Sequence, residues 1–401
     1  MGRQVAEALG ALRNLGTPEE IRALAQQDYG PRPPPRVNAH IHLPPNFTAF
    51  QSVQQAVRLA AEQGIGALGV SNYYDYEVYG AFVDCARQKS IFPLFGLEII
   101  CMDDALHDAG IKINDPGNPG KFYICGKGIT RFDEMTPEAA RLIDVIRRND
   151  STRMAQMIER MEHLFTERGL RTDIDENAVV EMIVRRHGSD RNTVVLQERH
   201  VSQAFQEALF QKVEPPERIE RLGRILGAEA KAKGPEDSVA MQNDIRSHLM
   251  KAGKPAFVEE TFISFDDAHR LILELGGVPC YPAVADGASP VCQFEQSPDK
   301  LIAAIKERNI HAAEWIPVRN TIDVLREYVM KMRKAGLAIT AGTEHNTLEL
   351  IPFDPFCKNG DVPEEIRAVF WEGACVVAGH QFLALNGECG VVDGRGRPNP
   401  N

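Results

Sequence analysis

Short apolar runs alternate with amphipathic stretches along most of the chain from residue 37, and this alternation constrains the fold most. Seven runs have the length and composition of β-strands: 37–42, 65–71, 92–99, 121–125, 277–282, 310–316 and 337–343. The helices expected between them cover 51–63, 76–89, 266–275, 298–307 and 321–335. Strand–helix alternation predicts an α/β fold with parallel strands and right-handed crossovers. Seven such strands favour a closed, distorted (β/α)7 barrel of the TIM type over an open sheet.

The interval 131–260 breaks this alternation because helical periodicity runs through all of it. An apolar stripe at helical spacing is formed by Met154, Met157, Ile158, Met161, Leu164 and Phe165. We therefore expect a helical insert at 131–260, between two parts of the barrel at 37–130 and 261–385. A helical arm with a proline-rich linker precedes the barrel over 1–36, and a loose tail follows it over 386–401.

Composition restricts the class of protein. Hydrophobic residues make up 43% of the chain and charged residues 25%, which is ordinary for a globular protein in water. The eight cysteines are scattered without a C-x-x-C pair, so we expect reduced thiols and a cytoplasmic location. We find no secretory signal and no apolar run of about 18 residues, so no membrane partner is expected. The net charge of −11 disfavours nucleic acid as a partner, short oligonucleotides excepted.

Polar side chains gather where the predicted strands end, which in parallel α/β barrels is the catalytic edge. His40 and His42 are two residues apart at the end of the first strand, so their imidazoles point the same way about 7 Å apart. Glu98 closes the third strand, and Glu344 and His345 close the seventh. These side chains predict a nitrogen and oxygen site for zinc, manganese or iron. The alternative is that the histidines line a core edge and the carboxylates are ordinary surface residues.

Four short motifs follow one another along the chain: His40-Ile41-His42, Gly96-Leu97-Glu98, the run 276–282, and Thr343-Glu344-His345. In their order and spacing they resemble the polymerase and histidinol phosphatase (PHP) family of metal-dependent phosphoesterases. The segments 199–204 and 253–258 are similar to the branch of this family that acts on nucleoside 3′,5′-bisphosphates and RNA 5′ ends. The resemblance covers about residues 37–350 and implies a site with two or three metal ions.

This chain departs from the family pattern where tyrosine stands in place of three ligand histidines, at Tyr73, Tyr123 and Tyr281. A phenol stays protonated at neutral pH and binds divalent metal poorly. The resemblance therefore implies a reduced ligand set that holds one divalent ion per chain: His40, His42, Glu98 and Glu344. The three tyrosines are either hydrogen-bond donors to a bound substrate or fillers of the vacated space.

Further site residues follow from the same resemblance. His345 stands beside a vacant metal position, where it is a candidate general acid or base, and Glu98 is assigned a catalytic role as well as a ligand role. Arg199 and His200 in the insert are candidate phosphate contacts, with a solvated surface histidine as the alternative for His200. Lys127 follows the fourth strand and could face an anion.

These expectations favour a metal-dependent hydrolase that cleaves a small, anionic, nucleotide-like phosphate ester with a metal-activated water. One alternative is a catalytically reduced PHP-like barrel that binds a ligand or regulates a partner. Another is an amidohydrolase-like enzyme that cleaves C–N or C–O bonds, because H-x-H on a first barrel strand also opens such sites. The sequence contains no P-loop, no G-x-G-x-x-G and no G-x-S-x-G, so nucleotide-cofactor and serine-hydrolase chemistry have no support.

Overall fold

The computed structural model describes residues 2–27 and 33–400, and its centre is a nearly closed sheet. Its main strands lie in the order β1 (Arg36–Ile41), β2 (Ile65–Val70), β3 (Phe92–Met102), β4 (Lys121–Lys127), β6 (Val278–Ala283), β7 (Ala312–Trp315) and β8 (Ala338–Ala341). The short β5 (Ile263–Ser264) pairs with β3. The two ends of the sheet meet where Ile41 pairs with Glu344 and the amide of His42 donates to the Glu344 carbonyl at 2.9 Å. The predicted distorted barrel is confirmed.

One strand runs against the prediction of an all-parallel barrel. β4 is antiparallel to both of its neighbours, β3 and β6, whereas the other main pairs are parallel. The segment that joins β3 to β4 contains only the five-residue helix α5 (Asp104–Asp108), which is too short to cross the sheet. The chain therefore turns back along β3, which brings Tyr123 opposite Ile100 and Lys127 opposite Gly96.

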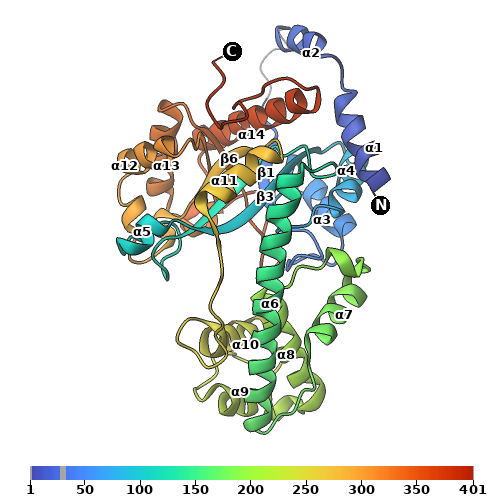
Figure 1. Cartoon of the computed structure of the whole chain (residues 1–401), viewed down its shortest axis with the longest axis vertical. Helices are drawn as coiled ribbons and strands as arrows, with labels where there is room; N and C mark the ends of the chain where they lie inside the picture. The colour runs from blue at the N-terminus through green and yellow to red at the C-terminus, as the bar shows by residue number, and fades with distance from the viewer. Residues whose placement is uncertain (1, 28–32, 401) are drawn as a thin grey trace.

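Helices surround the barrel, as Figure 1 shows. They are α3 (Val53–Glu62), α4 (Val78–Gln88), α11 (Phe265–Glu274), α12 (Pro298–Glu307), α13 (Ile322–Lys334) and α14 (Glu364–Leu385). The first five begin and end within two residues of the ranges that sequence periodicity predicts. Each buries one apolar face; in α3 this face consists of Val53, Ala56, Val57 and Ala60. Outside the barrel, the structure also describes α1 (Gly2–Arg13), α2 (Pro18–Ala25), β9 (Phe356–Cys357) and β10 (Gly360–Asp361).

The helix α14 corrects the expectation that the chain has no long apolar run. By length and composition it could cross a membrane, with a mean hydropathy of 1.3 over its most apolar window. Half of that window is buried in this structure, because α14 packs against β8, β1 and β3. Gly373 lies at the closest approach, where a Cβ atom would be only 1.9 Å from the Ile339 carbonyl oxygen. Such a helix is also typical of a protein core, and here it forms part of the barrel wall.

Replacing Gly373 with alanine should destabilise the fold by about 1–3 kcal/mol, because the added methyl group forces α14 away from β8. The matched control is Gly379→Ala on the same helix, where a Cβ atom meets nothing within 4 Å. That change should stabilise the protein by up to about 1 kcal/mol, since alanine is the better helix former. Urea unfolding of both variants measures the difference, and equal effects would contradict the packing described here.

Residues 131–260 form helices and contain no strand in the structure, and all of them are described. The helices are α6 (Pro137–Glu167), α7 (Glu176–His187), α8 (Glu198–Lys212), α9 (Arg218–Leu226) and α10 (Ser238–Ile245). They enclose a hydrophobic cluster of their own, separate from the cluster of the barrel. The long α6 contributes Ile143 and Ile146 to the barrel cluster and Met157 and Met161 to the other, so it ties the two together. The insert boundaries remain a prediction, and Pro31 and Arg32 of the expected linker lie outside the described residues.

Candidate metal centre

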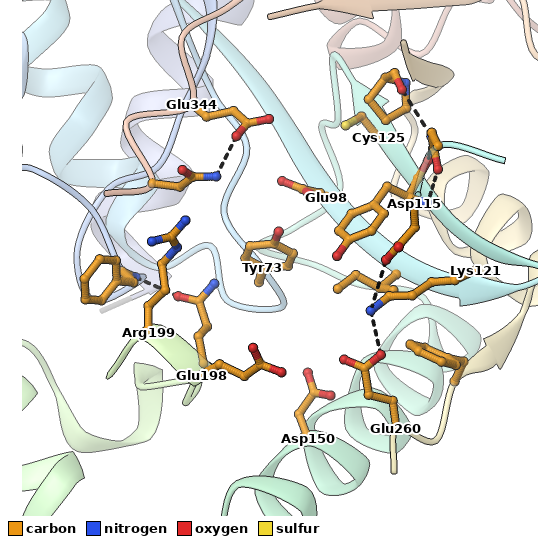
Figure 2. Close-up of a pocket in the computed structure, with 18 of the residues that line it drawn as sticks. Tyr73, Glu98, Asp115, Lys121, Cys125, Asp150, Glu198, Arg199, Glu260 and Glu344 are labelled. Carbon is orange, nitrogen blue, oxygen red and sulfur yellow. Dashed lines mark hydrogen bonds and ion pairs between the residues drawn. The ribbon is translucent and has the colours of Figure 1, made fainter. Parts of the chain in front are cut away.

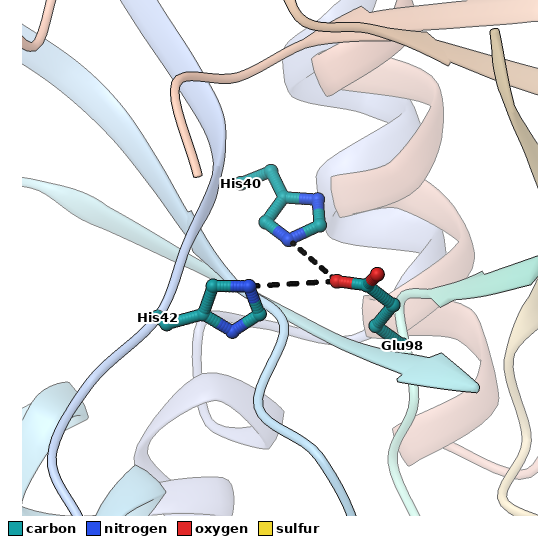
Figure 3. Close-up of side chains that lie close together, drawn as sticks. All are labelled: His40, His42 and Glu98. Atoms are coloured by element: carbon teal, nitrogen blue, oxygen red, sulfur yellow. Dashed lines mark ion pairs between the residues drawn. The ribbon is translucent and has the colours of Figure 1, made fainter. Parts of the chain in front are cut away.

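Three predicted ligands meet inside the barrel (Figure 3). His40 lies on β1, His42 follows that strand directly, and Glu98 lies in the middle of β3. The Glu98 Oε2 atom is 3.6 Å from His40 Nε2 and 3.4 Å from His42 Nε2. All three residues are buried, with 7% exposure at most. The alternation of side chains along an extended strand, which puts i and i+2 on one face, accounts for the histidine pair.

The facing atoms of this group suit a metal ion. His40 Nε2, His42 Nε2 and Glu98 Oε2 are buried and have no hydrogen-bond partner among the described residues. Nitrogen and oxygen ligands lie about 2.0–2.2 Å from zinc, so two ligands of a tetrahedral ion are about 3.4 Å apart. The observed separations of 3.4 and 3.6 Å match that spacing. Three protein ligands with an open position are typical of catalytic rather than structural metal sites.

A charged chain behind His40 fixes the orientation of its ring. His40 Nδ1 is 2.6 Å from Glu314 Oε2, and Lys127 Nζ is 2.5 Å from Glu314 Oε1. Lys127 also donates to the Ala39 carbonyl at 3.2 Å and to Ser71 Oγ at 3.3 Å. When a metal ion is bound, the Nδ1 proton held by Glu314 leaves the Nε2 lone pair for the ion, which is the usual arrangement of a metal-binding histidine.

The carboxylates of Glu314 and Glu98 favour a positive charge at the His40 ring, which is the protonated imidazole itself when no ion is bound. Burial alone would lower the pKa of His40, but Glu314 and Glu98 raise it to about 9. Burial would raise the pKa of Glu314, yet Lys127 and His40 hold it at about 2. The two adjacent histidines likewise outweigh burial and lower the pKa of Glu98. The carboxylates are therefore ionised at neutral pH and ready to balance a divalent ion.

Changing Glu314 to glutamine should weaken metal binding by about 10–100-fold, because the His40 ring loses its charged support. The matched control is Glu295→Gln, which makes the same change at a fully buried carboxylate outside the site. Zinc affinity, measured in competition with a chromophoric chelator, separates the two variants. Wild-type affinity in Glu314→Gln would show that this carboxylate does not support the metal site.

Glu344, the fourth predicted ligand, lies apart from the three-residue group. Its carboxylate pairs with Arg319, with Nη1 2.9 Å from Oε1, and accepts a hydrogen bond from Asn346 Nδ2 at 2.5 Å. The backbone around it nevertheless borders the site, because Gly342 approaches so closely that a Cβ atom there would be 2.3 Å from His40 Cβ. The structure thus brings together three of the four predicted ligands.

The placement of His345 does not support the predicted acid–base role. Its ring packs against Phe50 and Phe353, with centroid distances of 4.8 and 4.7 Å. Nδ1 is 2.7 Å from Thr343 Oγ1 and Nε2 is 3.0 Å from the Ile351 carbonyl oxygen, so both ring nitrogens have partners. Burial lowers the pKa of His345 to about 4. The ring is therefore neutral at physiological pH and holds the loop after β8 in place.

The three predicted substrate tyrosines separate into two groups. Tyr73 stacks on His42 at a centroid distance of 5.2 Å, and Tyr123 lies on β4 beside the Lys121 ammonium. Burial, with Glu98 as a further cause, raises the pKa of Tyr73 well above its usual value, so its phenol stays protonated. Tyr281 instead lies fully buried in the barrel core, where its hydroxyl donates to Glu295 at 2.8 Å. The substrate-binding prediction for Tyr281 is thus contradicted by its position.

The two insert residues also differ. Arg199 reaches toward the barrel with its guanidinium 5.9 Å from the Phe47 ring centroid, and burial with the nearby Arg246 lowers its pKa to about 10. His200 is buried, and its Nδ1 accepts a hydrogen bond from the Gln197 amide at 3.1 Å, which caps the first turn of α8. Burial lowers the pKa of His200 to about 3. Arg199 is therefore available to a ligand, whereas His200 stabilises a helix end.

A cavity of about 470 Å³ connects two of the metal ligands, His40 and Glu98, to the insert. Figure 2 shows charged side chains from both parts of the fold around it. Its wall includes His40 and Glu98 from the barrel, Tyr73 and Tyr123 beside them, and Arg199 from the insert. This volume suits a small molecule, and the polar groups that converge on it are typical of a binding site.

Sequence reasoning missed two kinds of residue at this site. Lys127 and Glu314 were not expected to support the metal ligands, although a carboxylate in the apolar run 310–316 is a signal because burial of an unpaired charge is costly. Asp150 lines the cavity from α6, and nothing in its local sequence separates it from an exposed helix residue.

No protein-family model and no curated protein matches the sequence. Solved structures do match the fold. A protein assigned as a metal-dependent phosphoesterase from Bifidobacterium adolescentis is 13% identical with a TM-score of 0.53, over 84% of this chain and 96% of that chain. An amidohydrolase from Chromobacterium violaceum, solved with bound sulfate and no metal, is 15% identical with a TM-score of 0.51, over 83% and 96% of the two chains. At these identities the likeness establishes the fold alone.

Proposed function

We propose that this protein is a metal-dependent hydrolase of small phosphate esters and holds one divalent ion between His40, His42 and Glu98. The observation that carries this proposal is the cluster of three buried ligand atoms, His40 Nε2, His42 Nε2 and Glu98 Oε2, beside a cavity of about 470 Å³ whose wall includes His40 and Glu98. Zinc, manganese and iron all suit this mixed nitrogen and oxygen set. A nucleotide-like substrate and a cytoplasmic location remain predictions from the sequence.

A single ion is proposed because other charges occupy the space around the ligands. The Lys127 ammonium lies inside the barrel and is paired with Glu314, so a fixed positive charge adjoins the site. Glu344 is paired with Arg319, and Tyr73 stacks on His42 with a protonated phenol. His40, Cys125 and Glu314 form a second candidate group, but it shares His40 with the first, and its Glu314 is already paired with the Lys127 ammonium, which would repel a second divalent ion.

The side chains around the cavity have different roles in the proposed hydrolysis. A divalent ion bound by these ligands would lower the pKa of its water to about 7 and polarise a phosphoryl oxygen. Tyr73 and Tyr123 carry protonated hydroxyls and donate hydrogen bonds to phosphoryl oxygens. The Arg199 guanidinium faces the same cavity and attracts the negative charge of the ester. Glu314 holds His40 in the orientation that the reaction requires.

Chelation followed by metal addition tests this proposal. Purified protein is treated with a chelator and then assayed against a panel of phosphomonoesters and nucleoside bisphosphates, with and without added Zn²⁺ or Mn²⁺. We expect hydrolysis that disappears on chelation and returns on metal addition. Metal binding without turnover of any member of the panel would overturn the enzyme proposal in favour of a ligand-binding barrel.

A further inference from the structure

The cavity contains one carboxylate and one guanidinium without an ion-pair partner in the described part of the chain: Asp150 on α6 and Arg199 on α8. Each of the other carboxylates in its wall lies within ion-pair distance of a basic side chain: Glu98, Asp115, Glu198, Glu260, Glu314 and Glu344. The other basic side chains are likewise paired with carboxylates: Lys121, Arg153, Arg246, Lys251 and Arg319. The cavity therefore offers a ligand one free charge of each sign.

The basic side chains near Asp150, Arg153 and Lys121, form ion pairs with other carboxylates. Arg153 Nη2 is 2.7 Å from Glu198, its Nη1 is 3.3 Å from Glu260, and its Nε donates to a backbone carbonyl at 3.1 Å. Lys121 Nζ is 2.6 Å from Glu260 and 3.6 Å from Asp115. Figure 2 shows the Asp150 carboxylate directed into the space between Glu198 and Glu260. No hydrogen bond or ion pair engages it among the residues that the structure describes.

Asp150 is half-buried in the cavity wall, and titratable groups that line a cavity without a partner gather at binding sites. Burial raises the pKa of Asp150 to about 7 despite the nearby Arg153, which agrees with the geometry. A protonated amine on a ligand would supply the missing partner through a charge-assisted hydrogen bond. The free Arg199 and the metal ligands offer the complementary attraction for an anion.

We propose that the substrate carries a protonated amine in addition to its phosphate ester, and that Asp150 binds this amine. This inference rests on the proposed phosphoesterase function, in which Arg199 and the metal ligands receive the phosphate. Asp150 thereby determines specificity, since it separates amine-bearing esters from simple alkyl esters.

Matched phosphonates test this pairing without turnover, because their C–P bond is not an ester. Calorimetry at pH 8, above the pKa of Asp150, compares ω-aminoalkylphosphonates of two to six carbons with alkylphosphonates of the same lengths on zinc-loaded protein. For at least one length we expect the amine to bind about tenfold more tightly or better, as a charged hydrogen bond implies. In Asp150→Asn this ratio should fall to about 1, because the amide carries no charge.

Two further variants sharpen the comparison. Arg199→Gln should weaken the binding of both the aminoalkylphosphonate and the alkylphosphonate of the same length. The ratio of their two affinities should stay at its wild-type value. Asp144→Asn removes the same charge from an exposed position of α6 and should leave the ratio at its wild-type value. A ratio near 1 in the wild type, or a high ratio that persists in Asp150→Asn, would overturn the assignment of Asp150. Failure of all the phosphonates to bind would overturn the phosphate-ester proposal as well, so the two failures are distinguishable.

Discussion

Glu98→Gln should reduce metal-dependent phosphoester hydrolysis by about a thousandfold or more, because the ion loses its only anionic ligand in the three-residue group. The amide keeps the shape of the side chain. The loss of activity would therefore result from the lost charge and metal coordination rather than from altered packing. Steady-state rates at saturating Zn²⁺ or Mn²⁺ measure the effect.

The control for this prediction is Glu295→Gln, which removes a buried carboxylate that hydrogen-bonds Tyr281 in the core. Its rate should stay within about a factor of three of the wild type if the fold is retained, and circular dichroism checks that retention. Comparable rates in Glu98→Gln and the wild type would mean that Glu98 neither binds the metal nor takes part in catalysis.

His40→Ala should lower metal affinity by more than about a hundredfold, because loss of a direct ligand costs more than the 10–100-fold typical of an outer partner. The protein should then purify without metal, as elemental analysis after dialysis would show. The same substitution leaves Glu314 paired with Lys127, so the fold keeps one half of its buried charge chain.

Tyr281→Phe is the control for the His40 variant. Its hydroxyl contacts Glu295 within the core, so its removal should barely alter metal content. Equal metal content in His40→Ala and Tyr281→Phe would place the bound ion elsewhere in the chain.

The barrel could be predicted because each of its strands and helices has a recognisable pattern in its own local sequence. Apolar runs such as 65–71 and amphipathic helices such as 298–307 follow from periodicities of two and 3.6 residues. The reversed direction of β4 could not be predicted from local sequence, because the direction of a strand depends on how the segment between β3 and β4 crosses the sheet. That reversal carries Lys127 into the barrel interior, where it supports Glu314 and His40.

The candidate site could be predicted for those residues whose positions follow from sequence spacing alone. His40 and His42 share a face because alternate residues of a strand do, and Glu98 joins them from a neighbouring part of the barrel. Glu344 and Tyr281 show the limit of that reasoning. Their type and position suggested the site, but their side chains are engaged by Arg319 and Glu295, partners that local sequence does not reveal.

X-ray diffraction from zinc-loaded crystals, with data at the zinc absorption edge, tests the central claim most directly. The account predicts one strong anomalous peak per chain, about 2.0–2.2 Å from His40 Nε2, His42 Nε2 and Glu98 Oε2. A second strong peak inside the barrel would contradict the single-ion site. A peak bound to Glu344 and absent from the His40, His42 and Glu98 group would contradict the site itself.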